Sequence, residues 1–240
     1  MILDCVYSGI NILIPSICPV CGRHPAVHPH PVCRSCAGAL QSPASGIRTT
    51  AVNLRAVWSC CWYHGKSAEC VRLLKYGGKR KMMNVFNEMI GSFLAGKPDL
   101  DAAELIIPVP VHWSRLHGRG YNQALLIARS VSETASIPIS RNGLIKIRNT
   151  PPQAGITKKR RIRNLKDSFL APDRLSLVGK SVLLVDDVIT TGATMETCAA
   201  ELLKAGVREV LGFTIAKTPL SQRTENRKQR TEDRKWKKRI

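Results

Sequence analysis

The chain has 240 residues, of which 44% are hydrophobic and 22% charged, the usual balance of a globular protein with a buried core. Lys and Arg total 37 against 17 Asp and Glu, so the formal net charge is +20 and a polyanionic ligand, nucleic acid or an anionic surface is the expected partner. No stretch approaches the roughly 18 to 20 apolar residues of a membrane-spanning helix, and the N-terminus lacks the basic start of a secretory signal. The composition therefore predicts a cytoplasmic protein without a membrane span.

Two Cys-x-x-Cys pairs near the start of the chain are separated by eleven residues: Cys18, Cys21, Cys33 and Cys36. Two such turns bring four thiolates together around one zinc ion, and an all-thiolate site without an open position is structural. Three histidines lie between the pairs and could replace a thiolate, but with four cysteines available we expect them to be exposed loop residues: His24, His28 and His30. The pattern predicts a small zinc-binding module.

The other five cysteines lack ligand spacing: Cys5, Cys60, Cys61, Cys70 and Cys198. An odd total of nine in a chain of this length argues against a disulfide framework. Cys198 lies on the apolar stripe of a predicted helix, so we expect it in the core.

Apolar patterns after the module predict a strand from about residue 53 and a helix over 67–76 that ends at Gly77-Gly78. Short apolar runs then alternate with helices, giving strands at 105–109 and 144–147 around a helix over about 121–134. The continuously apolar run 182–185 is typical of a central parallel strand covered on both faces. A helix from Met195 to Gly206 and a strand over 207–216 follow. The predicted fold class is α/β, a parallel sheet with helices on both faces.

These patterns divide the chain into a four-cysteine module over residues 1–52, an α/β domain over 53–218 and a basic tail over 219–240. The tail is almost devoid of apolar residues and is predicted to be disordered. The polar segment 148–166 contains seven basic residues and no acid, which predicts a long mobile loop. Its four consecutive cations could close over a bound anion as a lid or contact nucleic acid: Lys158, Lys159, Arg160 and Arg161.

The most informative stretch, 182–194, runs from the buried strand through two acids, Asp186 and Asp187, into a helix. Between the acids and the helix stands a loop of hydroxyls and one glycine: Thr190, Thr191, Gly192, Ala193 and Thr194. Backbone N–H groups and the helix dipole converge there, which favours binding of a phosphate. The carboxylates at the strand end would then face the hydroxyls of a sugar attached to that phosphate.

Three other interpretations compete with a sugar-phosphate site. A response-regulator receiver also places two aspartates after an apolar strand, but only 54 residues follow Asp186, too few for the rest of that fold. A Walker A loop needs a Gly-Lys-Ser/Thr ending that is absent. An acidic capped turn without a ligand stays open as the simplest alternative.

This pattern resembles the 5-phosphoribosyl-1-pyrophosphate (PRPP) loop of the type I phosphoribosyltransferases. The upstream stretch Pro-Val-Pro at 108–110, followed by Arg115 and by Arg-Gly-Tyr-Asn-Gln at 119–123, is similar to a motif of the ComF family, which includes competence and GntX-like DNA-utilisation proteins. The Leu-Lys-Tyr-Gly-Gly stretch at 74–78, the segment 153–164 and the cysteine module also fit, so the resemblance covers about residues 1–217.

The resemblance implies a type I phosphoribosyltransferase fold that binds PRPP, or another phosphoribosyl compound, together with Mg²⁺. Asp186 and Asp187 would hold the ribose and stabilise the positive charge on its ring carbon. The leaving pyrophosphate would move toward Arg115 and Arg119.

A second hypothesis is a non-catalytic accessory protein that retains the PRPP pocket. Its partners would be single-stranded or double-stranded DNA or a protein of the competence machinery. The zinc module and the net charge of +20 favour contacts to a phosphate backbone. Aromatic residues make up only 5% and are not interleaved with the basic runs, which argues against base-stacking platforms.

Overall fold

The computed structural model describes residues 16–27, 29–40, 46–76, 80–95, 100, 102–150, 158–165 and 167–219. The predictions for Cys5, His28, Gly77-Gly78, residues 151–157 and the basic tail from residue 220 lie outside these residues. Within the described ranges no helix is long and apolar enough to cross a membrane.

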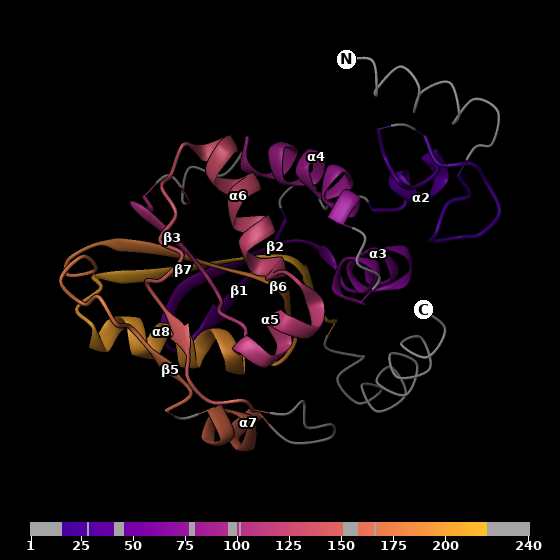
Figure 1. Ribbon diagram of the computed structural model, residues 1–240. Coiled ribbons are helices and arrows are strands. Elements are labelled where there is room, and N and C mark those ends of the chain that lie inside the picture. The colour runs from indigo at the N-terminus through magenta and orange to yellow at the C-terminus, as the bar shows by residue number, and fades with distance from the viewer. Residues whose placement is uncertain are drawn as a thin grey trace, which may run out of the picture.

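A five-stranded sheet forms the centre of the molecule (Figure 1). Its order is β1 (Ile47–Ala51), β2 (Leu54–Trp62), β7 (Glu209–Lys217), β6 (Ser181–Ile189) and β3 (Leu105–Pro108). All neighbours pair in parallel except β1, which pairs antiparallel with β2 at the edge. The predicted parallel sheet is confirmed, with an antiparallel edge strand that the sequence analysis did not predict.

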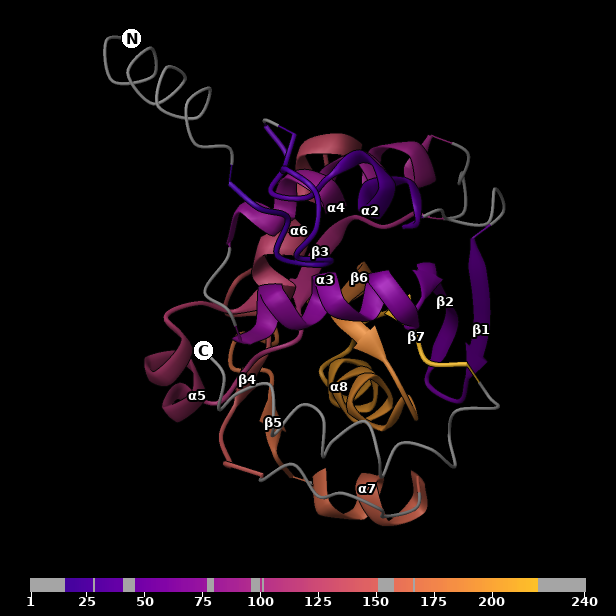
Figure 2. The same cartoon turned by 90° about the vertical axis from the view of Figure 1, so that its right-hand side faces the viewer.

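Helices cover both faces of this sheet (Figure 2). One face carries α3 (Gly65–Tyr76), α4 (Met83–Leu94) and α6 (Gln123–Ala135), and the other carries α8 (Ala193–Lys204). Successive side chains of a strand point to opposite faces. Accordingly, on β6, Leu183 and Val185 join the apolar cluster of α3, α4 and α6, whereas Val182 and Leu184 join that of α8. Both faces of β6 are therefore buried, as its continuous apolar run predicts.

Smaller elements complete the described chain: α2 (Arg34–Gly38), the 3-10 turn η1 (Arg80–Met82), α5 (Trp113–Arg119), α7 (Lys158–Leu165), β4 (Ile145–Lys146) and β5 (Phe169–Leu170). The short strands β4 and β5 pair antiparallel in a second sheet. The strand predicted at 144–147 therefore exists, but it lies outside the main sheet.

The prediction of a loop over 148–166 is wrong for residues 158–165, which form α7. This helix packs against α8, and Leu165 contacts the apolar cluster on that face. Lys, Arg and Leu have high helix propensity, so two apolar residues three apart, Ile162 and Leu165, suffice to anchor one short helix. The sequence analysis missed it because so short an apolar pattern has no visible periodicity.

The four-cysteine segment does not have a core of its own. Cys18, Cys33 and Cys36 belong to the same apolar cluster as Cys70 of α3 and Phe86 of α4. Polar contacts join the same surfaces, because the Asn84 side chain donates to the Pro29 carbonyl at 2.9 Å and His30 Nε2 lies 3.0 Å from a Glu88 oxygen. The four-cysteine segment therefore shares a core with α3 and α4.

Strand β1 (Ile47–Ala51) is part of the main sheet, although it precedes the predicted boundary at residue 52. We propose that the boundary falls between Leu40 and Gly46.

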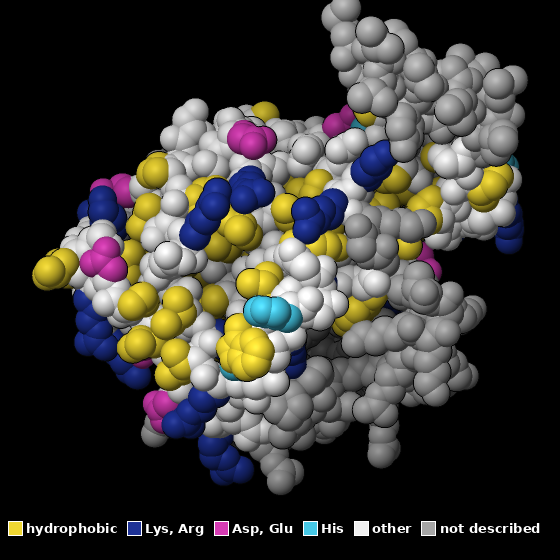
Figure 3. All heavy atoms as spheres, in the orientation of Figure 1, with side chains coloured by type: hydrophobic (Ala, Val, Ile, Leu, Met, Phe, Trp, Pro, Cys, Tyr) yellow, Lys and Arg dark blue, Asp and Glu magenta, His cyan; other side chains and the backbone are white. Residues whose placement is uncertain are grey.

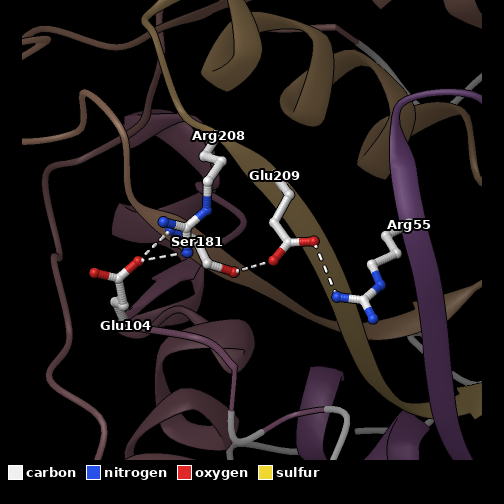
Figure 4. A network of polar contacts seen from close by, with 5 residues as sticks. All are labelled: Arg55, Glu104, Ser181, Arg208 and Glu209. Atoms are coloured by element: carbon white, nitrogen blue, oxygen red, sulfur yellow. Dashed lines mark hydrogen bonds and ion pairs between the residues drawn. The ribbon is translucent and has the colours of Figure 1, made fainter.

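A polar network fixes the register of the strands at the amino ends of β3, β6 and β7 (Figure 4). Glu104 accepts hydrogen bonds from the Ser181 backbone N–H at 2.9 Å and from Arg208 at 3.0 Å. The Ser181 hydroxyl donates to Glu209, which also pairs with Arg55 of β2 at 3.1 Å. These contacts tie four parallel strands together at the edge opposite to the predicted site.

Hydrogen exchange tests the interior position of β6. Its amides at 182–185 pair with β3 and β7 and are covered on both faces, so they should be among the slowest to exchange. The amides of β1 at the sheet edge should exchange faster, since β1 pairs with β2 alone among the described strands. Exchange of 182–185 at the rate of β1 would contradict the buried-strand assignment.

Candidate functional site

The sheet reverses its strand order between β3 and β6. After β3 the chain passes through α6 and returns as residues 138–140, which pair in parallel on the outer side of β3. After β6 it passes through α8 and returns as β7 on the other side. Ligands of open α/β sheets bind at the carboxyl ends of the strands where such a reversal opens a crevice. The candidate site therefore lies beyond the ends of β3 and β6.

Side chains end the pairing of β3 with β6 at this crevice. The last ladder bond in the described chain runs from the Val109 N–H to the Val185 carbonyl, at 2.8 Å. In a parallel ladder the next bond would join the Asp187 N–H to the Val109 carbonyl. Instead, Asp186 Oδ1 accepts from the Asp187 N–H at 2.8 Å, and the Asn122 side chain donates to the Val109 carbonyl at 3.1 Å. Both backbone groups are satisfied while the strands are left free to separate.

Strand β6 does not stop at the two acids, as the sequence analysis assumed, but continues to Ile189 along β7. A turn at residues 190–192 then leads into α8. Gly192 is the N-cap of this helix and has φ 78°, a left-handed backbone conformation that residues other than glycine rarely adopt. Thr191 Oγ1 accepts from the Ala193 N–H at 3.4 Å. The predicted strand, loop and helix are thus present, with the N-terminus of α8 behind the loop.

Asp187 is paired with a residue that the sequence analysis had not assigned to the site. The Lys75 ammonium group, in the last turn of α3, lies 2.9 Å from Asp187 Oδ1. The side chains are 21% and 12% exposed, so both charges are largely removed from water. Burial on its own lowers the pKa of Lys75, but the Asp187 carboxylate outweighs it and raises that pKa above its ordinary value.

Asp186 points to the opposite side of β6. Alternation places Asp187 on the face of α3 and Asp186 on the face of α8, where its charge also acts on the thiol of Cys198. Burial and the neighbouring Asp187 charge raise the pKa of Asp186 to about 7, against an opposing effect of Lys75. The two acids therefore point to opposite faces of β6 and have different surroundings.

Two arginines of α5 stand one helical turn apart, after the Pro-Val-Pro stretch. Arg115 donates to the Thr150 carbonyl at 2.7 Å and Arg119 donates to Gln123 at 2.6 Å, and both are half-buried. Burial, and next the charge of Arg119, lower the pKa of Arg115. The Arg119 guanidinium also lies over the ring of Tyr76, 5.3 Å from its centroid. The arginine pair is therefore tied both to the end of α3 and to the start of the basic segment.

Lys146 of β4 is a further cation that the sequence analysis missed. Burial and the charge of Arg115 lower its pKa, while Asp186 acts in the opposite direction. Lys146 therefore stands in the electrostatic neighbourhood of both Asp186 and Arg115. No motif marks it, since it occurs in a short strand between polar segments.

The cations proposed as a lid occur in the first turn of α7, and only the backbone of Lys158, Lys159, Arg160 and Arg161 is described. Their role stays a prediction.

The four predicted zinc ligands form one cluster, whose sulfur atoms all lie within 4.8 Å of one another. Cys21 Sγ and Cys33 Sγ are 3.8 Å apart. Thiolates bound tetrahedrally to one zinc ion at about 2.3 Å would be separated by about 3.8 Å, so the cluster fits a zinc ion. Backbone N–H groups of Arg23 and His24 lower the pKa of Cys21 to about 6, which favours the thiolate that zinc requires.

The residues around this cluster behave largely as predicted. His24 is exposed, whereas His30 contacts Glu88 and is only partly exposed. The cysteines without ligand spacing that the structure describes are all buried and unbridged: Cys60, Cys61, Cys70 and Cys198. Cys198 lies in the core, as its helical stripe predicts.

Comparisons with known proteins show which sequences this chain resembles. A family model described as a phosphoribosyl transferase domain matches residues 122–240. Competence protein ComFC of Bacillus subtilis is 30% identical over 212 residues, 88% of this chain and 82% of that protein. DNA utilization protein YhgH of Escherichia coli strain K12 is 27% identical over 207 residues, 85% of each chain. Competence protein F of Haemophilus influenzae is 40% identical over 119 residues, which span 49% of this chain and 52% of that protein.

The raised pKa of Asp186 predicts how stability depends on pH. Between its ordinary value of 3.8 and about 7, Asp186 is ionised in the unfolded chain and protonated in the folded one. The folded chain then binds more protons, so the free energy of unfolding should fall as pH rises through this range. Denaturant titrations from pH 4.5 to 8 should show a smaller fall for Asp186→Asn than for the unaltered chain. Equal slopes for the two proteins would contradict the assignment.

Proposed function

The chain belongs to the ComF family of competence and DNA-utilisation proteins, and from that premise we propose that it binds PRPP with Mg²⁺ as a phosphoribosyltransferase-type protein. The observation that carries the proposal is the turn of residues 190–192, where Gly192 in a left-handed conformation joins an interior strand to the N-terminus of α8. Backbone N–H groups at such a helix start, together with the helix dipole, bind a phosphate group. The 5-phosphate of PRPP, a phosphate monoester, is the group that would bind there.

The ribose would lie over the end of β6. A carboxylate accepts hydrogen bonds from vicinal hydroxyl groups. Asp187 stands two residues before the end of β6 at Ile189, beyond the last ladder bond between β6 and β3. As the bond from C1 to pyrophosphate breaks, positive charge develops on the ring carbon. The negative charge of Asp187 would stabilise it, joined by that of Asp186 above the raised pKa of about 7, and this is the catalytic contribution that fixed charges make in a water-poor site.

The pyrophosphate would bind to Arg115 and Arg119. Arginine makes charge-assisted hydrogen bonds to phosphate oxygens, and the two guanidinium groups are already half-buried and held by Thr150 and Gln123. Mg²⁺ would enter with the ligand and would offset negative charge on the leaving group. The donors suit that ion, because Mg²⁺ takes oxygen ligands and the crevice carries carboxylates at its edge.

We also propose that the cluster of Cys18, Cys21, Cys33 and Cys36 holds one structural zinc ion. All four positions around the metal would be taken by thiolates, which leaves no site for a substrate. The metal would stabilise a segment whose apolar side chains complete the cluster of α3 and α4.

A nucleic-acid accessory role is the second candidate, and the net charge of +20 favours it. Figure 3 shows Lys and Arg side chains in separate groups on the visible face, with acidic side chains between some of them. A continuous basic stripe would favour backbone binding more strongly. Two relatives have names that refer to competence and to DNA utilisation. These names support DNA, or a protein of the competence machinery, as the partner in this second role.

Calorimetry with PRPP and Mg²⁺ tests the phosphate site. Thr191→Val with Thr194→Val removes two hydroxyl donors, and each hydrogen bond to a charged phosphate contributes ~1.5 to 3 kcal/mol, so affinity should fall at least tenfold. Thr197→Val is the matched control, because its hydroxyl donates within α8 to the Ala193 carbonyl and should leave affinity unchanged. Absence of heat from the unaltered chain at millimolar PRPP would reject the proposed ligand and move the accessory role to first place.

Metal analysis of the purified protein tests the zinc site. The unaltered chain should carry about one zinc per molecule, Cys18→Ser/Cys33→Ser should carry none, and Cys198→Ala should keep it. Because the module shares its core with α3 and α4, loss of zinc should lower the main melting temperature of the whole chain. Full zinc content in the double variant, or an unchanged main transition after zinc loss, would contradict this account.

A further inference from the structure

Three consecutive residues at the end of α3 contact three different parts of the candidate site. The Leu74 carbonyl accepts a hydrogen bond from the hydroxyl of Tyr121, Lys75 pairs with Asp187, and the ring of Tyr76 lies under Arg119. This end of α3 therefore stands between the carboxylate of β6 and the arginines of α5.

Of these three residues at the end of α3, Lys75 is the one whose charged side chain could bind a ligand. Its ammonium group lies 2.9 Å from Asp187 Oδ1, and its side chain is 21% exposed. An ion pair removed from water gains Coulomb energy but loses hydration of both ions, so its net contribution to stability is small. A ligand that offers suitable groups to both side chains can therefore replace the contact between Lys75 and Asp187.

PRPP has suitable groups at adjacent carbons. Its pyrophosphate is attached to C1, and the hydroxyls that a carboxylate would bind are on C2 and C3. A cation that touches the hydroxyl-binding carboxylate is consequently next to the pyrophosphate. Hydroxyl donors can take the place of the ammonium group on Asp187, and the phosphate oxygens can take the place of Asp187 on Lys75.

We propose that Lys75 is a pyrophosphate-binding residue, held by Asp187 in the empty site and transferred to the pyrophosphate when the ribose hydroxyls occupy Asp187. This inference rests on the proposed function, since it assumes that a phosphoribosyl diphosphate occupies the crevice. No covalent bond is made or broken in the exchange, and neither side chain gains or loses a proton. Lys75 supplies a third cation for the pyrophosphate beside Arg115 and Arg119.

The proposed exchange predicts a result that would not be expected if the ion pair of Lys75 and Asp187 were purely structural. Pyrophosphate alone has no hydroxyls to occupy Asp187, so its binding must break the ion pair without replacement. Removing the Asp187 charge should therefore strengthen pyrophosphate binding while weakening binding of PRPP. The strengthening should depend on Lys75 and disappear when Lys75 is also replaced.

Calorimetry with three probes at fixed Mg²⁺ and ionic strength tests this: PRPP, ribose 5-phosphate and inorganic pyrophosphate. Lys75→Gln should weaken PRPP and pyrophosphate at least tenfold, about 1.4 kcal/mol, and should not weaken ribose 5-phosphate, whose hydroxyls would displace Lys75 from Asp187 without giving it a new partner. Asp187→Asn should bind pyrophosphate severalfold more tightly than the unaltered chain, and Lys75→Gln/Asp187→Asn should not. Lys66→Gln is the matched control, because Lys66 is an exposed lysine on the same helix and its loss changes the net charge equally.

Each outcome decides a separate claim. If the unaltered chain binds no PRPP, the proposed function fails. If it binds PRPP and Lys75→Gln binds pyrophosphate as the unaltered chain does, only the role of Lys75 is overturned. Should Lys75→Gln melt below the assay temperature because Asp187 is left unpaired, the comparison of Asp187→Asn with the double variant decides instead, since the Asp187 carboxylate is absent from both. Equal pyrophosphate affinities in those two proteins would reject the proposal.

Discussion

The point at which the β3–β6 ladder stops determines where the site can form. Beyond Val185, strand β6 continues along β7 but loses β3, because the side chains of Asp186 and Asn122 take the two backbone groups that would form the next bond. Satisfied backbone groups carry no desolvation penalty, so the crevice can open inside a tightly paired sheet. The strand order reverses at the same place, which directs α6 and α8 to opposite faces.

Each face of β6 carries one of the two acids, and each acid has a cation nearby. On the α3 face, Asp187 is neutralised by Lys75, and on the α8 face, Asp186 lies in the electrostatic neighbourhood of Lys146. With Arg115 and Arg119 added, cations outnumber the two carboxylates, as expected of a pocket for a ligand with several phosphate charges. The two acids are adjacent in sequence but have different partners, so their roles in ligand binding are expected to differ.

The sequence predicted the elements whose signals are local, and it failed where the contacts are distant. The interior strand, the threonine-glycine turn and the four cysteines each lie within a short pattern with its own chemistry, and each is present. Lys75 was passed over because its partner is more than a hundred residues away, and α7 because two apolar residues make no visible period. The shared core of the cysteine segment was likewise missed, since small apolar residues near zinc ligands do not indicate what covers them.

A crystal structure with ribose 5-phosphate bound tests the central claim most directly. The account predicts the phosphate at the N-terminus of α8, within hydrogen-bond distance of backbone N–H groups at residues 191–194, and the ribose hydroxyls toward Asp187. A phosphate bound elsewhere on the chain while this turn stays free of ligand would contradict it.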